Sequence, residues 1–228
     1  MNKFVDIQSL IHVALGLQEL REKVVFVGGA VINLYNDDLA SEEIRPTEDI
    51  DMTLQLENYF EWAIMQERLL ELEFFPDPFG HAICSYQFKG IPIDIMPAEN
   101  SAIGHSNRWY APGFKDLKKV VIGNNISIQI LSAPYFLATK FEAFKNRGFN
   151  DYRGSHDFED IVFVLDNRTT IVNEILSADE DVKSFLKKEI LFLKNHKNAD
   201  EILSMHIHPL IVKERFELLM SKINLITE

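Results

Sequence analysis

Cysteine is nearly absent from this sequence, because Cys84 is the single one among 228 residues. One cysteine cannot form a disulfide within the chain, and it has no second thiol nearby to build a thiolate metal site. Its apolar surroundings, HAICSYQF, predict a side chain in the core. Disulfide-stapled scaffolds and cysteine-based zinc folds are therefore excluded.

Long hydrophobic runs are lacking as well. No window reaches the roughly 20 uncharged apolar residues that span a bilayer. The first ten residues, MNKFVDIQSL, lack the apolar stretch and the small-residue cleavage site of a signal peptide. We therefore expect a cytoplasmic protein that makes no membrane contact.

Positive charge is scarce, since 23 Lys and Arg face 35 Asp and Glu and give a net charge of −12. This balance argues against strong indiscriminate binding to phosphate backbones, although a nucleic acid remains open as a specific substrate. Two basic stretches, one around Lys115 to Lys119 and one from Lys140 to Gly154, could line a groove. The alternative for the first stretch is a solvated helix face.

Hydrophobic periodicity predicts an α/β (α+β) fold, with a mixed sheet of about five strands and packed helices, followed by a helical carboxyl-terminal lobe. We expect two domains, 1–131 and 132–228. The strands are expected at 24–27, 49–56, 82–88, 91–96 and 126–130. A hairpin turn at Lys89-Gly90 is expected to join the strand 82–88 to the strand 91–96. Helices are expected at 6–23, 30–35, 57–72, 133–146, 156–166, 169–178, 180–195 and 209–223.

Three aspartates carry the strongest chemical signal. Asp49 and Asp51 lie two residues apart in TEDIDMTLQL, and Asp94 lies in GIPIDIMP. Residues i and i+2 of a strand point to the same face, so the first two carboxylates can share one point in space. A neighbouring strand that brings Asp94 there would complete a set of hard oxygen ligands suited to Mg²⁺ or Mn²⁺. The alternative for the aspartate pair is a set of exposed edge charges.

A glycine pair, Gly28-Gly29, follows the apolar run VVFV and precedes a helical pattern. Such a turn lets backbone N–H groups approach an anion at the start of a helix. Glycine pairs at strand ends also serve simple tight turns. Two metal ions about 4 Å apart on the aspartates, beside this turn, could activate an attacking oxygen and stabilise a leaving pyrophosphate.

Together these residues resemble the nucleotidyltransferases of the DNA polymerase β superfamily. The motif of that superfamily is a glycine pair at a helix start, then Asp-x-Asp, then a third Asp on a neighbouring strand. Within it, FVGGAVINLY, RPTEDIDMTL and LSAPYFLATKFEAFKNRGFNDYRGSHDFEDIVFVL look like the AbiEii/AbiGii toxin-type branch. The resemblance covers about residues 24–166.

The resemblance implies an NTP-dependent and Mg²⁺-dependent (or Mn²⁺-dependent) enzyme that moves an NMP to an acceptor hydroxyl and releases pyrophosphate. It implies that Lys140 faces the triphosphate. The implied catalytic residues are Asp49, Asp51, Asp94 and Asp157, of which the first three hold the metal. The implied nucleotide-binding residues are Gly28, Gly29, Arg45, Thr47 and Lys140.

Several of these roles have structural alternatives. Asp157 and Asp160 could act as a general base or orient Lys140, or they could cap the helix and pair with Arg147 and Arg153. Arg45 and Thr47 could touch phosphate or merely shape the turn. His156 stands where the family commonly has Arg or Lys.

Other polar and aromatic residues give weaker signals. His206 and His208 are expected to be structural, because two histidines without a third ligand rarely make a zinc site. A further group could stack on a substrate ring or form an ordinary surface loop: His81, His105, Arg108, Trp109 and Tyr110.

The resemblance leaves the acceptor open. Members of the toxin branch modify RNA, notably the 3′ end of tRNA, and an antitoxin protein is then a possible partner. A small-molecule acceptor of the aminoglycoside type is the alternative, because an acidic protein suits a cationic sugar. A catalytically silent nucleotide-binding module is the third hypothesis, which the intact aspartate set disfavours.

Overall fold

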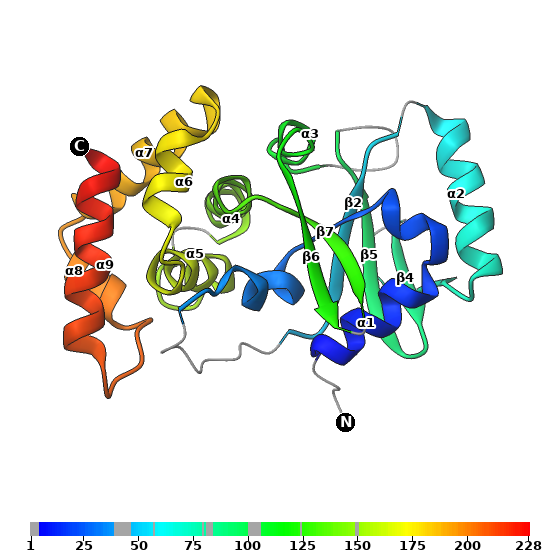
Figure 1. Cartoon of the computed structure of the whole chain (residues 1–228), viewed down its shortest axis with the longest axis horizontal. Coiled ribbons are helices and arrows are strands. Elements are labelled where there is room, and N and C mark those ends of the chain that lie inside the picture. Colours follow the sequence, from blue (N-terminus) through cyan, green and yellow to red (C-terminus); the bar gives the residue numbers. More distant parts are fainter. Residues whose placement is uncertain are drawn as a thin grey trace. The chain divides into compact units, whose positions relative to one another are not determined.

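The computed structural model describes residues 5–38, 47–56, 58–78, 80, 84–99, 106–123, 125–148 and 151–228. By their contacts, the residues form two compact units, and Figure 1 labels most of their helices and strands. We call Met1–Asn33 with Ile44–Ser132 the sheet unit, and Leu34–Glu43 with Ala133–Glu228 the helical unit. The segment Leu34–Glu43 therefore groups with helices that follow it by about a hundred residues.

In its described residues, the sheet unit is built on one mixed sheet of seven strands in the order β3-β4-β5-β2-β1-β7-β6. β2 is parallel to β5 and β1 is parallel to β7, whereas the other neighbouring strands are antiparallel. The mixed α/β class is as expected, but the expected count of about five strands is wrong. The strands are β1 Val25–Val27, β2 Ile50–Leu54, β3 Phe75–Pro76, β4 Ser85–Phe88, β5 Ile91–Pro97, β6 Leu117–Gly123 and β7 Ile126–Leu131.

The largest departure from the sequence analysis is β6, which occupies the basic stretch after Lys115. Lys118 and Lys119 lie on this strand and pair with β7, so the alternative of a solvated helix face is wrong. β6 is the last strand of the sheet, and both lysines are exposed. Lysines at a sheet edge discourage pairing with other chains. Their solvent exposure weakens the hydrophobic signal by which a strand is predicted from sequence.

The central strands show why the aspartates reach one face of the sheet. Ile50 and Met52 on β2, and Ile93 and Ile95 on β5, are each at most 1% exposed. Because side chains alternate along a strand, the residue between each pair, Asp51 or Asp94, points to the other face. Burial of the four apolar side chains therefore fixes the direction of both carboxylates.

The expected helix at 6–23 is two elements, α1 Ile7–Gly16 and the 3-10 helix η1 Gln18–Glu22. α1 begins after Asp6, whose carboxylate accepts a hydrogen bond from the Ser9 amide at 2.8 Å, and it packs beside β6 and β7 (Figure 1). At its end Gly16 lies so close to Phe88 that a Cβ there would meet the ring at 2.4 Å. Gln18 then adopts a positive φ of 49°. Hydrophobic spacing continues across this break, so periodicity alone could not detect it.

The remaining helices of the sheet unit are short or amphipathic. α2 Tyr59–Glu71 is capped by Asn58, whose side chain accepts from the Glu61 amide, and it buries Trp62, Met65 and Leu69. The expected helix at 30–35 is a 3-10 helix, η2 Gly29–Tyr35, whose last two residues group with the helical unit. A four-residue helix, α3 Tyr110–Gly113, lies in a stretch expected to be a loop.

The helical unit centres on two buried helices, α4 Ala133–Arg147 and α5 His156–Asn167, which pack on each other. α7 and α6 contact α4, and α9 contacts α5, α6 and α7. α8 was not expected from the sequence. The outer helices are α6 Ile171–Ser177, α7 Glu180–Lys194, α8 Ala199–Ser204 and α9 Val212–Thr227.

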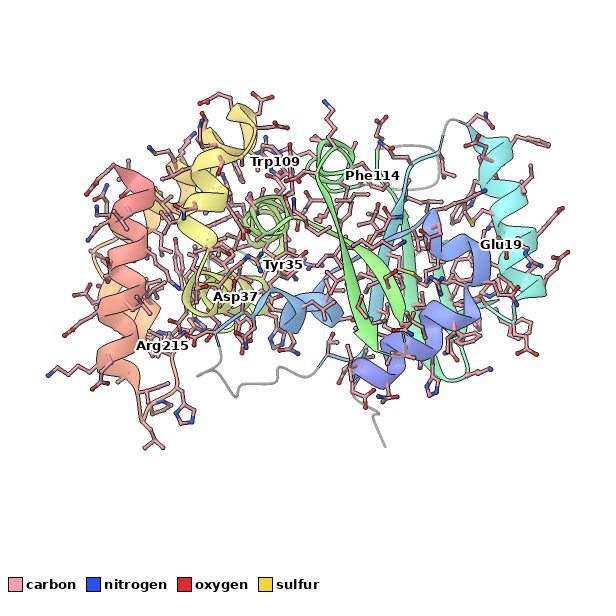
Figure 2. The ribbon with its side chains drawn as sticks, in the orientation of Figure 1. Glu19, Tyr35, Asp37, Trp109, Phe114 and Arg215 are labelled. Atoms are coloured by element: carbon pink, nitrogen blue, oxygen red, sulfur yellow. The ribbon has the colours of Figure 1, made fainter. Side chains whose placement is uncertain are left out.

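Charged groups hold the segment after η2 against the carboxyl end of α5. The amides of Asp37 and Asp38 both donate to the carbonyl of Asn167, and the Asp38 carboxylate pairs with Arg215 of α9 (Figure 2 labels Asp37 and Arg215). Lys222 donates to the carbonyls of Leu165, Asp166 and Arg168. Side chains of α9 thereby satisfy carbonyls that the helix end leaves without a helical partner.

No helix in the described part of the chain combines the length and the apolarity needed to cross a membrane.

Candidate functional site

The glycine pair lies directly beside an aspartate. Val27, the last residue of β1, pairs with Asp51 of β2, and Gly28 follows with a φ of +70°. A Cβ on Gly28 would lie 1.9 Å from the Asp51 Oδ2. This distance is far shorter than a van der Waals contact, so no side chain fits at position 28. Glycine is required here both for the backbone conformation and for the close approach of the carboxylate.

The structure brings the three predicted metal ligands together. Asp51 and Asp94 are direct partners in the parallel ladder between β2 and β5, and Asp49 lies just before β2 on the same side as Asp51. Oxygen atoms of Asp49, Asp51 and Asp94 all lie within 4.8 Å of one another, and each residue is half-buried. Three hard oxygen donors at this spacing fit a divalent cation such as Mg²⁺ or Mn²⁺.

Two hydroxyl groups orient the outer members of this carboxylate cluster. Thr47 Oγ1 donates to Asp49 Oδ1 at 3.3 Å, and Ser85 Oγ donates to Asp94 Oδ1 at 2.7 Å. A Cβ on Gly29 would come within 3.1 Å of Thr47 Oγ1. Thr47 therefore lies between the glycine turn and the cluster, where it both shapes the loop and directs one ligand.

The negative charge of the cluster affects the neighbouring thiol. Burial raises the pKa of Cys84, and the charges of Asp94 and Asp51 raise it further. Cys84 is buried, as the sequence predicted. The local potential is thus one that attracts a cation.

Ser85 is the residue of this site that the sequence analysis missed, although a signal for it existed. In the β4–β5 hairpin, Phe88 pairs with Ile91 around the Lys89-Gly90 turn, and Ser85 pairs with Asp94 by the same register. A two-residue hairpin fixes the register from its turn outward. Counting back from Gly90 would have placed a serine opposite the third aspartate.

Lys140 and Asp157 belong to the helical unit, where they form a buried ionic group with Asp160, and the exposed Arg147 pairs with Asp157 from the surface. The Lys140 ammonium lies 2.6 Å from the Asp160 Oδ2 and 3.2 Å from the Asp157 Oδ1. Arg147 donates to both oxygens of Asp157, at 2.8 and 2.9 Å. The proposed ion pair of Asp157 with Arg147 is therefore present, whereas Arg153 pairs with Glu201.

This environment changes the acidity of Asp157. Burial by itself raises the pKa of the carboxyl, but the hydrogen bonds from Arg147 and the charges of Lys140 and Arg147 outweigh it, and the pKa is lowered. Asp157 is consequently ionised near neutral pH. A carboxylate in this state can hold Lys140 in place.

The other candidates divide into buried, exposed and undescribed residues. Trp109 and Tyr110 are each 8% exposed, and the Arg108 guanidinium lies 5.1 Å from the centre of the Trp109 ring. Both rings are therefore buried in this structure, and a role in stacking on a substrate stays untested. His156 is an exposed side chain that bonds to Glu159 in the first turn of α5. Arg45, His81 and His105 lie outside the described residues.

His206 has a structural role, as expected. Its Nε2 lies 2.7 Å from the Tyr152 carbonyl, and its ring packs edge-on against Phe158 with 5.3 Å between centres. His208 lies in a turn and is exposed, and its Nδ1 accepts from the Leu210 amide at 3.3 Å. Neither histidine belongs to a cluster of metal-binding side chains among the described residues.

Comparison with known proteins adds no identification. No model of a known protein family matches this chain, and no curated protein matches its sequence.

Proposed function

We propose that this chain is a metal-dependent nucleotidyltransferase, which moves an NMP from an NTP to an acceptor hydroxyl and releases pyrophosphate. The observation that carries the proposal is the carboxylate cluster of Asp49, Asp51 and Asp94, which lies beside the Gly28 turn. The resemblance of the sequence to DNA polymerase β-like nucleotidyltransferases supports the same reaction. A cluster of this kind without a cation repels itself, so a bound ion accounts for its three charges.

In this proposal the chain supplies ligands, a phosphate cradle and a proton acceptor. The three aspartates hold one or two divalent ions, which when bound neutralise the triphosphate and stabilise the leaving pyrophosphate. Backbone N–H groups at Gly28 and Gly29 bind phosphate oxygens. Asp94 accepts the proton of the acceptor hydroxyl. The hydroxyl oxygen forms a bond to the α-phosphorus of the NTP, and the bond from that phosphorus to the pyrophosphate oxygen breaks.

Lys140 and Asp157 enter the proposal through the resemblance, as triphosphate ligand and supporting carboxylate. The ion pairs within the helical unit support one specific division of labour: Asp157 and Asp160 orient the ammonium, and Lys140 carries the positive charge offered to phosphate. Asp157 is then a positioning residue.

For the acceptor, the resemblance favours RNA, notably the 3′ end of tRNA, with an antitoxin protein as a partner. One observation favours a small cationic acceptor of the aminoglycoside type instead. With a net charge of −12, the protein attracts polycations and repels phosphate backbones. A silent nucleotide-binding module is the third outcome that an experiment must distinguish.

The test is a transfer assay with each of the four α-³²P-labelled NTPs and Mg²⁺ or Mn²⁺. The acceptors are total tRNA, kanamycin-type aminoglycosides or lysate protein, and Asp49→Asn serves as the inactive control. Label on RNA supports the toxin-type activity, and label on the drug supports the small-molecule acceptor. Tight NTP binding without transfer supports the silent module. If the wild type neither binds nor transfers any NTP, the proposed function is wrong.

A further inference from the structure

A large groove opens at the end of the sheet opposite to the carboxylate cluster. Val25 of β1, Leu54 of β2 and Pro97 of β5 line it, whereas the cluster lies where β1 ends and β2 begins. Asp51 and Leu54 are three residues apart on one strand, which corresponds to about 10 Å. A ligand in the groove would therefore leave the carboxylate site open.

The groove combines a buried apolar floor with an exposed apolar edge. Its floor includes Leu54 and Met65, which are 1% and 6% exposed. Its edge includes Tyr59 and Ile64 of α2, which are 66% and 51% exposed, and the next residue of α2, Phe60, is 71% exposed. Large apolar side chains gathered on one helix in this way mark a surface that contacts another molecule.

The charge around the groove is acidic. Among the residues that the structure describes, four glutamates line it against two cations, Lys23 and Arg68. The Arg68 guanidinium pairs with Glu19 and Glu71 at 2.7 Å each. The Glu19–Arg68 pair therefore adds no net charge, and the acidic excess comes from the other three glutamates against Lys23 (Figure 2 labels Glu19, beside α2, and Phe114, another lining residue). The glutamates are Glu19, Glu22, Glu61 and Glu99.

Size and charge together select the class of occupant. The groove has a volume of about 1290 Å³, larger than the roughly 300–1,000 Å³ of small-molecule pockets. Nucleic acid and a second copy of this chain, which carries a net charge of −12, both bring further negative charge to an acidic rim. A protein segment with basic and large apolar side chains complements both the rim and the edge.

We propose that this groove binds a basic, amphipathic segment of a partner protein, with its apolar side chains against Tyr59 and Ile64 and its cations at the glutamate rim. This inference is independent of the proposed function. It requires no residue of the carboxylate cluster, and the partner would bind at the far end of the strands that carry that cluster.

The test is fluorescence anisotropy with a labelled 15-residue helical peptide of Leu, Trp and Lys, compared with the same peptide in which Glu replaces every Lys. We expect the lysine peptide to bind the wild-type protein at least ten-fold more tightly than the glutamate peptide. Ile64→Ser should weaken its binding five-fold or more, and so should the double variant Glu61→Gln/Glu99→Gln.

Matched controls separate this groove from general attraction to an acidic protein. Leu218→Ser and the double variant Glu214→Gln/Glu217→Gln alter exposed residues of α9 in the same way and should leave binding unchanged. Asp49→Asn should also leave it unchanged. Equal affinity for both peptides would overturn the proposal. So would full affinity in Ile64→Ser and in Glu61→Gln/Glu99→Gln, or equal losses in the controls or in Asp49→Asn. Circular dichroism of each variant establishes that it is folded.

Discussion

Asp51 lies directly opposite Asp94 in the parallel ladder between β2 and β5. The two residues are 43 positions apart in the sequence, yet hydrogen bonding of the strands holds their carboxylates side by side. With Asp49 they form a site that destabilises the folded protein in the absence of a cation, because the carboxylates repel one another. A cation that binds there stabilises the folded protein.

The first prediction is that Asp94→Asn changes stability in opposite directions without and with a bound cation. In EDTA, Asp94→Asn should stabilise the protein by about 1 kcal/mol, because it relieves repulsion between half-buried carboxylates. In millimolar Mn²⁺ the wild type should become the more stable protein, since only its full ligand set binds the ion well. Urea unfolding in the two buffers measures both values. Glu67→Gln, at an exposed position of α2, should show no such reversal; a variant less stable than the wild type in EDTA would contradict the prediction.

The second prediction separates backbone strain from the close approach at Gly28. Gly28→Ala and Gly90→Ala both place a side chain at positive φ, +70° and +81°, and each should lose about 1 kcal/mol of stability. Only at Gly28 would the new Cβ collide with Asp51, because nothing lies within 4 Å of a Cβ at Gly90. Calorimetric titration with Mn²⁺ should therefore show lost binding in Gly28→Ala alone. Equal Mn²⁺ affinity in the two variants would exclude the predicted clash.

The third prediction concerns Ser85, which orients Asp94. Ser85→Ala removes the 2.7 Å hydrogen bond to the Asp94 carboxylate and should weaken Mn²⁺ binding about 10-fold to 100-fold, the usual cost of losing a group that orients a metal ligand. Ser85→Thr should restore most of the affinity. Ser127→Ala, on β7, serves as the matched control in the same titration. An unchanged affinity in Ser85→Ala would mean that the hydrogen bond does not orient the ligand.

The fourth prediction is a pH dependence of stability in the helical unit. The folded-state pKa of Asp157 is lower than its ordinary value, so its contribution is fully present above the unfolded pKa of about 3.9 and is lost as the pH falls through the folded value. Asp157→Asn should therefore cost about 1–3 kcal/mol at pH 7 and less at pH 3, which lies below the unfolded pKa. Urea unfolding at the two pH values measures the difference. Asp200→Asn, an exposed residue of α8, should change stability by less than about 0.5 kcal/mol at either pH.

The fifth prediction concerns Lys222, which is 7% exposed and donates to three carbonyls at the end of α5. Lys222→Met keeps most of the side-chain volume but removes one hydrogen bond from each carbonyl, although Asp166 keeps Arg215 as a donor and Arg168 keeps the Ile171 amide. It should therefore cost about 1–3 kcal/mol of stability. Thermal unfolding measures this loss. Lys213→Met, at an exposed position of the same helix, should have little effect, and an equal loss in both variants would argue against the capping role.

The sequence determined the elements whose pattern is strong and local. Apolar residues flanking each aspartate were enough to predict strands with one buried face, and the glycine pair was enough to predict a turn beside them. The spacing of Asp49 and Asp51 could be read directly, because the two residues share a strand direction. Hairpin geometry at Lys89-Gly90 could also have given the partner of Asp94.

Tertiary structure decided what depends on partners distant in the chain. β6 is a strand because β7 offers it a free edge, although its exposed lysines give no strand-like pattern. α1 ends at Gly16, where the chain meets Phe88, and Lys140 is held by carboxylates of α5. The meeting of Asp51 with Asp94 depends on which strands became neighbours, and that choice follows from how the whole sheet buries its apolar faces rather than from any short stretch of sequence.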